Sequence, residues 1–113
     1  MPAIPKLIIA GPIVEPIISA AKPTVKDVIV RKPTEEENQT CKNWPIWSCD
    51  KSTFDWDYTQ TETCLILEGK VTVKDRPGEN SVSFGAGDLV IFPVGLKCVW
   101  QVAEAVRKHY NFE

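Results

Sequence analysis

The stretch WDYTQTETCLILEG, residues 56–69, decides the fold of this chain. Its even-numbered residues would share one face of a strand, because side chains of a strand alternate with period two. The even-numbered residues at the centre of this face include Trp56, Tyr58, Glu62, Cys64 and Ile66. That face is aromatic and apolar around one carboxylate. Burying a carboxylate among such side chains is costly, so the pattern indicates a functional role for Glu62.

The rest of the chain after residue 54 reads as short strands separated by turns. We expect strands at 64–68, 71–74, 81–84, 89–92, 97–102 and 106–112. A tight connection at Gly69 would separate the first two, and the run RPGEN at 76–80 would close a hairpin between 71–74 and 81–84. Strands at a spacing of roughly 8 to 12 residues with little helix predict an antiparallel sandwich or barrel.

The beginning of the chain has a different composition. Seven of the nine prolines lie between Pro2 and Pro45, and proline fixes φ and removes a backbone donor. We therefore divide the chain into an extended, proline-rich arm at 1–24 and a β domain at 25–113. Edge or partner-binding strands are expected at 7–10 and 13–19. The isoleucines there are costly to leave in water, which favours a docked arm over a disordered tail and predicts a homodimer formed by strand exchange.

Between the arm and the stretch at 56–69, three local patterns can be read. Residues 25–31 have the β-branched content of a strand. Thr34 and Glu37 have the spacing of a capping box, which predicts one or two turns of helix before Cys41. The run WPIW at 44–47 is too aromatic for an exposed loop, so it covers an end or face of the core or forms a wall of a ligand pocket.

Composition excludes several classes of function. The 113 residues are 43% hydrophobic and 25% charged, which fits one compact domain. The net charge of -2 and the absence of a basic stripe argue against binding to nucleic acid or to an anionic membrane. The chain contains no C-x-x-C pair, which excludes a zinc ribbon and a thioredoxin-like redox motif. We read the cysteines as reduced and the protein as cytoplasmic, with a plastid or another organelle as the alternative.

Two spaced motifs resemble a known family. Glu62-x6-Gly69 is similar to the end of the first cupin motif, and Gly87-x5-Pro93-x-Gly95-x2-Cys98 is similar to the second. With the runs WPIW at 44–47 and RKHYNF at 107–112, residues 25–113 resemble a small single-domain cupin subgroup related to the cupin domain of ureidoglycine aminohydrolase. The resemblance implies an all-β, antiparallel jelly-roll barrel, often dimeric, with the two motifs facing each other across its interior.

This sequence departs from the metal-binding cupins at the ligand positions. Where those proteins place three histidines, this chain has Trp56, Tyr58 and Cys98, and only Glu62 of the usual four ligands remains. Tryptophan offers no lone pair to a metal, a neutral tyrosine binds poorly, and two remaining ligands are too few for ordinary zinc or iron sites. We therefore expect no metal and no other cofactor. The sole histidine, His109, matches none of the metal positions.

The candidate site is an aromatic pocket around Glu62. The candidate catalytic residues are Glu62, Tyr58 and Cys98, and the candidate ligand-binding residues are Trp56, Tyr58, Glu62, Cys64, Ile66, Cys98 and Trp100. Glu62 would act as a general acid or base, or hold an amide or amine of a ligand. The alternative to a functional Glu62 is a structural carboxyl whose hydrogen bonds come from Tyr58 and backbone donors. Cys98 would be either a nucleophile or a buried thiol that only packs in the core. The sequence pattern offers no cation that would activate the thiol, which favours packing.

Three functions follow from these observations. The first is binding, or transformation without metal, of a small polar or nitrogenous molecule in the pocket. The second is a non-catalytic interaction protein that dimerises through its arm and sheet while side chains fill the barrel. The third, a metal-dependent aminohydrolase like the ureidoglycine enzyme, needs the missing histidines. A cavity inside the barrel would favour the first function, and a barrel filled by side chains would favour the second. We expect Arg107 and Lys108 to be surface cations near the mouth.

Overall fold

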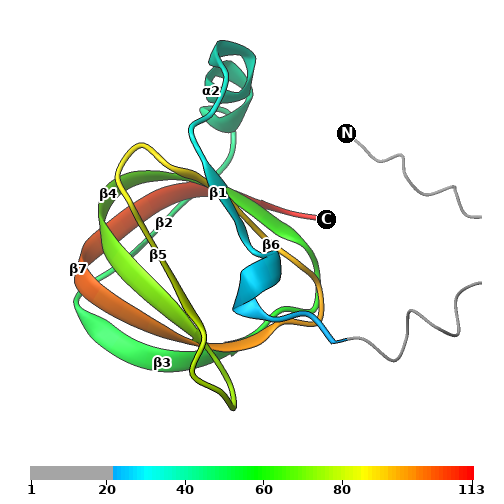
Figure 1. Ribbon diagram of the computed structural model, residues 1–113. Coiled ribbons are helices and arrows are strands. Elements are labelled where there is room, and N and C mark those ends of the chain that lie inside the picture. Colours follow the sequence, from blue (N-terminus) through cyan, green and yellow to red (C-terminus); the bar gives the residue numbers. More distant parts are fainter. Residues whose placement is uncertain (1–21) are drawn as a thin grey trace, which may run out of the picture.

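Two long antiparallel strands, β4 (Glu62–Asp75) and β7 (Lys97–Phe112), pair along their whole length in the middle of the sheet and form part of the barrel wall (Figure 1). The computed structural model describes residues 22–113. Most of the proposed arm, with the strands expected at 7–10 and 13–19, lies outside the described residues. The first half of β4 and the second half of β7 belong to a sheet of order β1-β6-β4-β7-β2, while their other halves pair with β5 and β3.

The shorter elements complete a curved, closed arrangement around the interior (Figure 1). In chain order they are η2 (Val25–Asp27), β1 (Ile29–Arg31), α2 (Glu35–Cys41), β2 (Ile46–Cys49), β3 (Ser52–Asp57), β5 (Ser81–Gly85) and β6 (Leu89–Phe92). All the strand pairs are antiparallel. The expected antiparallel jelly roll is confirmed, and so is the hairpin that joins β4 to β5.

Gly69 lies within a strand, although we expected it to end one. β4 is continuous through this position, and the register with β7 shifts on both sides of it. Gly69 has a φ of 102°, and a Cβ there would run into the carbonyl oxygen of Ala105 and lie 2.7 Å from the Cα of Val106. The glycine therefore forms a β-bulge that bends the two paired strands without breaking them. For the same reason, the strands expected at 97–102 and 106–112 are one strand, β7.

The prediction for the segment before the barrel is also partly wrong. Residues 25–27 form a 3-10 helix, capped by Thr24, and only Ile29–Arg31 is a strand. The predicted capping box is confirmed: the Thr34 side chain accepts from the Glu37 N–H, and Glu37 accepts from the Thr34 N–H, at the start of α2. The Arg31 guanidinium also donates two hydrogen bonds to the Glu37 carboxylate, and this contact lowers the pKa of that carboxyl to about 2.

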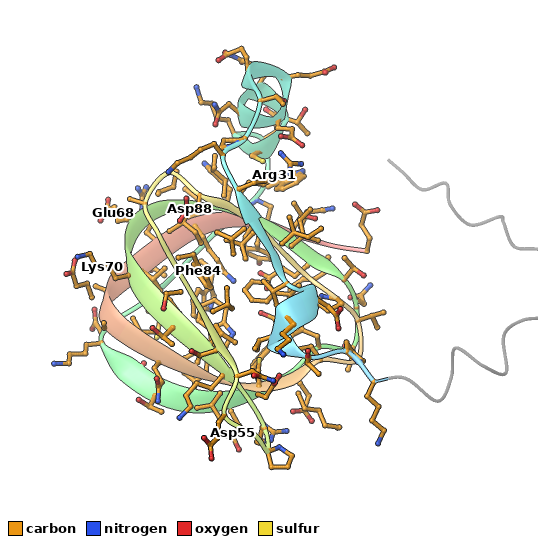
Figure 2. The ribbon with its side chains drawn as sticks, in the orientation of Figure 1. Arg31, Asp55, Glu68, Lys70, Phe84 and Asp88 are labelled. Carbon is orange, nitrogen blue, oxygen red and sulfur yellow. The ribbon has the colours of Figure 1, made fainter. Side chains whose placement is uncertain are left out.

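Side chains divide cleanly between the interior and the outside of the barrel. Figure 2 shows Phe84 pointing inward, while Asp55, Glu68 and Lys70 point away from the interior. A large buried cluster lies inside the barrel, and a smaller cluster around Cys41 lies beneath α2 on the outer face of the sheet. Within residues 22–113, no helix is long and apolar enough to cross a membrane.

Candidate functional site

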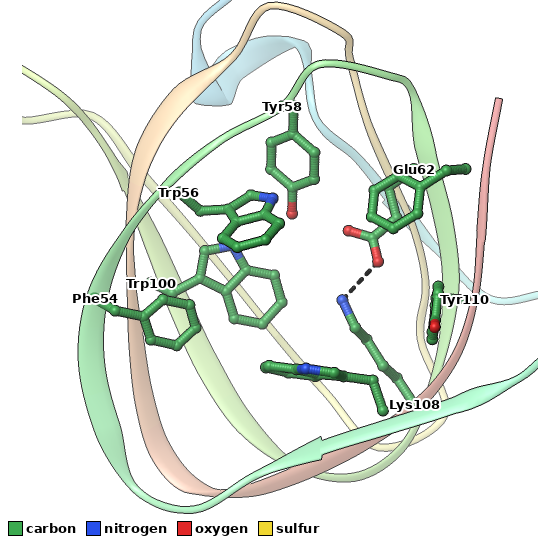
Figure 3. A pocket seen from close by; sticks show the side chains of 9 residues that line it. Phe54, Trp56, Tyr58, Glu62, Trp100, Lys108 and Tyr110 are labelled. Carbon is green, nitrogen blue, oxygen red and sulfur yellow. Dashed lines mark hydrogen bonds and ion pairs between the residues drawn. The ribbon is translucent and has the colours of Figure 1, made fainter.

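A cavity of about 140 Å³ lies inside the barrel, between β2, β3, β7 and the start of β4 (Figure 3). Seven of its nine lining side chains are aromatic. They are Trp47, Phe54, Trp56, Tyr58, Trp100, Tyr110 and Phe112, and the other two are Glu62 and Lys108. The side chains do not fill the barrel, which is the feature that separates a ligand-binding reading from a packed one.

The polar centre of this cavity is an ion pair. The Nζ of Lys108 lies 2.7 Å from the Oε2 of Glu62 and donates a hydrogen bond to it, and the two side chains are only 6% and 3% exposed (Figure 3). Glu62 is the first residue of β4, opposite Phe92 and Phe112, and Lys108 lies on β7 opposite Trp47. The interior of the barrel therefore contains a buried positive group, Lys108, in direct contact with a buried negative group, Glu62.

The Lys108 ammonium also lies against two indole rings. Its nitrogen is 4.9 Å from the ring centroid of Trp47 and 4.6 Å from that of Trp100. These two rings meet edge to face, with their centroids 6.0 Å apart. A cation is attracted to the negative face of an aromatic ring. The carboxylate and the two rings together compensate the ammonium for its lost hydration.

Our expectation that Lys108 is a surface cation is wrong. The side chain is buried because Lys108 has the inward parity of its neighbours Val106 and Tyr110 on β7. That parity is visible in the sequence and would have placed Lys108 inside the barrel. Glu62 consequently has a charged partner. Our expectation that this carboxylate is surrounded only by aromatic and apolar side chains is therefore wrong.

Two polar atoms in the cavity wall have no partner. The hydroxyl of Tyr58 and the indole Nε1 of Trp100 are both buried, and neither makes a hydrogen bond within the described part of the chain. Burial first, and the charge of Glu62 second, raise the pKa of Tyr58 far above its ordinary value, and the Glu62 carboxylate near the hydroxyl adds to this rise, so the hydroxyl keeps its proton. Leaving a buried polar group unsatisfied costs about 1–3 kcal/mol. Both atoms belong to side chains that line the cavity.

The aromatic walls are held in place by stacking. Phe54 on β3 is directly opposite Trp100 on β7, and their rings stack at 5.9 Å. Tyr58 stacks on Phe92 at 4.8 Å, and its backbone is hydrogen-bonded to Gly95 and Leu96. Such contacts fix the rings before any ligand arrives.

Three predicted site residues do not line this cavity. Cys64, Ile66 and Cys98 are completely or almost completely buried in the core cluster. The Sγ of Cys98 donates to the carbonyl oxygen of Trp56, and burial raises the pKa of this thiol to about 12. Core residues and cavity residues share the same inward parity, so parity alone cannot separate them. These positions support the packing interpretation of Cys98 and not the nucleophile.

Of the predicted site residues, Trp56, Tyr58, Glu62 and Trp100 line the cavity. Trp47, from the run at 44–47, joins them, which agrees with its interpretation as a pocket wall. Trp56 is 46% exposed and Phe112 is 38% exposed, so these two rings form the side that is open to solvent.

The donor set of this site does not fit a metal ion. Glu62 is engaged by Lys108, and Cys98, at the position of a histidine ligand, is hydrogen-bonded to the backbone. No group of three histidine, cysteine, aspartate or glutamate side chains that could hold a metal occurs among residues 22–113. His109 is bonded through Nδ1 to the carbonyl oxygen of Trp44. The cation that faces Glu62 here is a lysine ammonium.

Comparison with known proteins gives a family match and several similar structures. The EutQ-like cupin domain model matches residues 36–110. A DUF861 family protein from Thermotoga maritima is 47% identical, with a TM-score of 0.72 over 77% of this chain and 100% of that chain. The EutQ protein of Clostridium difficile is 20% identical, with a TM-score of 0.54 over 83% of this chain and 76% of that one, and shows the fold alone. No curated protein matches.

Proposed function

The chain belongs to the family of EutQ-like cupin domains, and on that premise we propose that it binds a small polar or nitrogenous molecule in the aromatic cavity around Glu62. The observation that carries this proposal is the pair of buried, unpartnered polar atoms, the Tyr58 hydroxyl and the Trp100 Nε1, on two side chains that line the cavity. A ligand that bonds to both atoms removes the cost of leaving them unsatisfied.

The cavity offers both kinds of hydrogen bond. Trp100 and Lys108 can donate, the second oxygen of Glu62 can accept, and Tyr58 can do either. The surrounding ring faces can pack against the body of a ligand. Proton transfer without a metal would fall to Glu62, Lys108 or a tyrosine hydroxyl, since these are the titratable groups that line the space.

Indole N–H resonances test this proposal directly. The chain has four tryptophans, so a ¹H–¹⁵N spectrum resolves four indole signals, and Trp100→Phe identifies the one from the cavity. We expect a library of small polar fragments to contain compounds that move the Trp100 signal downfield, as an N–H does when it gains an acceptor. Tyr58→Phe and Trp100→Phe should each weaken binding of those compounds about tenfold.

The matched control is Trp44. Its ring packs beside the outer cluster beneath α2, away from the cavity, so its indole signal should not move and Trp44→Phe should not change affinity. If no fragment of any charge shifts the Trp100 signal, the proposal is wrong.

A second candidate function is self-association. Ile29 on β1 and Ile46 on β2 are exposed, and these strands stand at the two ends of the main sheet. Exposed apolar residues on edge strands favour pairing with another chain. Light scattering on the full chain and on a chain lacking residues 1–21 tests the homodimer and the role of the arm. A monomer at all concentrations would contradict both.

A further inference from the structure

The charge balance of the cavity restricts the chemistry of its ligand. We infer that the site takes an uncharged, planar molecule of the carboxamide type, in which a carbonyl oxygen and an N–H are neighbours. This inference rests on the proposed function. It is carried by the Lys108–Glu62 pair and the two unpartnered atoms beside it.

The pair leaves the cavity with no net charge. Lys108 contributes one positive charge and Glu62 one negative charge, and they are the charged side chains among the lining residues. An ionic ligand would bring a third charge into an aromatic space without a partner of its own, which is costly. A neutral ligand avoids that cost.

Each kind of ion also meets a specific obstacle. The faces of Trp47 and Trp100 are the natural site for a ligand cation, but the Lys108 ammonium already occupies them. Lys108 would in addition repel a second cation. An anion could approach Lys108 only beside Glu62, whose carboxylate is already bonded to that ammonium at 2.7 Å.

The hydrogen-bonding groups match an amide. The Trp100 N–H and the remaining protons of Lys108 can only donate, and they require an acceptor such as a carbonyl oxygen. Among the described residues, Glu62 is bonded through Oε2 alone, so Oε1 can accept from an N–H. Tyr58 can serve either partner. One carboxamide carries both functions on adjacent atoms and supplies no charge.

The size and the walls favour a flat molecule. The cavity holds about 140 Å³, and an engineered apolar cavity of about 150 Å³ in another protein accepts benzene. Most of the wall consists of ring faces and edges, against which a planar body packs well. The exposed rims at Trp56 and Phe112 leave room for a substituent that points toward solvent.

Three isosteric probes test the charge rule. Benzamide, benzoate and benzamidinium have the same shape and carry charges of zero, minus one and plus one. Affinities for the full-length protein are measured at pH 7.5 from the shift of the Trp100 indole signal. The smaller series acetamide, acetate and acetamidinium covers a ligand that is smaller than the ring. We expect the amide of at least one series to bind about tenfold more tightly than either ion.

Charge-altering variants sharpen the test. Glu62→Gln leaves a net positive cavity and should shift the preference toward benzoate, whereas Lys108→Met leaves a net negative cavity and should shift it toward benzamidinium. The double variant restores neutrality and should again prefer benzamide. The control variant Lys70→Met removes an exposed lysine outside the cavity and should leave the order of affinities unchanged.

The outcomes separate the two proposals. An ion that binds the wild-type protein as tightly as the amide, or more tightly, overturns the neutral-ligand inference while ligand binding itself stands. If neither amide shifts the Trp100 signal although other fragments do, the inference again fails alone. If nothing moves that signal, both proposals fail. Should a charge variant not fold, the wild-type affinities still decide the question.

Discussion

The ammonium of Lys108 lies 2.7 Å from the carboxylate of Glu62, although 46 positions separate the two residues in the sequence. Here a side chain of the closing strand supplies the positive charge. The pair makes the site neutral, and it ties the start of β4 to the second half of β7. Its consequences can be measured in stability as well as in binding.

Removing one partner of this pair should destabilise the fold strongly. Glu62→Gln or Lys108→Met leaves an uncompensated charge inside the barrel, and we expect either change to lower the free energy of unfolding by about 3–5 kcal/mol. The double variant should recover most of that loss, because no lone charge remains. Urea unfolding followed by tryptophan fluorescence measures all four proteins. Losses that simply add would show that the two residues do not act as a pair.

The unpartnered hydroxyl of Tyr58 should reduce stability in the absence of ligand. Tyr58→Phe keeps the stack on Phe92 and removes only the buried oxygen, so we expect the free energy of unfolding to rise by about 1 kcal/mol. Thermal unfolding without ligand measures the change. The control is Tyr110→Phe, at a half-buried ring of the same cavity, which should have an effect of less than about 0.5 kcal/mol. A destabilised Tyr58→Phe would mean that the hydroxyl has a partner.

Gly69 should tolerate no side chain. Gly69→Ala places a Cβ against the backbone of Ala105 and Val106 at a φ of 102°, and we expect a loss of roughly 2–4 kcal/mol. Gly87→Ala is the matched control. Its φ is 94°, but a Cβ there meets only the flexible end of Lys32 at 3.5 Å, so the cost should be about 1–2 kcal/mol from the backbone conformation alone. Equal losses in chemical denaturation would contradict the close approach of β4 and β7.

The Cys98 thiol should be inert in the folded protein. Burial raises its pKa to about 12, so almost none is thiolate at pH 8, and the thiolate is the reactive form. We expect a disulfide reagent to label the half-buried Cys49 first and to label all four cysteines only after unfolding. Cys49→Ser should abolish the early reaction, and Cys98→Ser should leave it intact. Rapid labelling of Cys98 at pH 8 would revive the nucleophile hypothesis.

Local patterns predicted most of the fold. The capping box at Thr34 and Glu37, the hairpin after residue 74 and the strand at 89–92 depend on residues that are close in the sequence, and the structure confirms each of them. The errors concern residues 25–27, which form a 3-10 helix, the stretch 56–69, which is divided between β3 and β4, and Gly69 with the two halves of β7. A glycine that ends a strand and a glycine that bends one look alike in sequence, because the difference is made by the backbone of Ala105 and Val106 on the other strand.

The candidate site divides in the same way. The sequence by itself determined that Trp56, Tyr58, Glu62 and Trp100 face the interior, because strand parity is a local property. It could not determine that Cys64, Ile66 and Cys98 pack into the core and leave a cavity beside them. Only the tertiary structure decided that Lys108 meets Glu62. Their contact depends on the pairing of two distant strands, and the low dielectric of the interior then makes it the strongest electrostatic feature of the site.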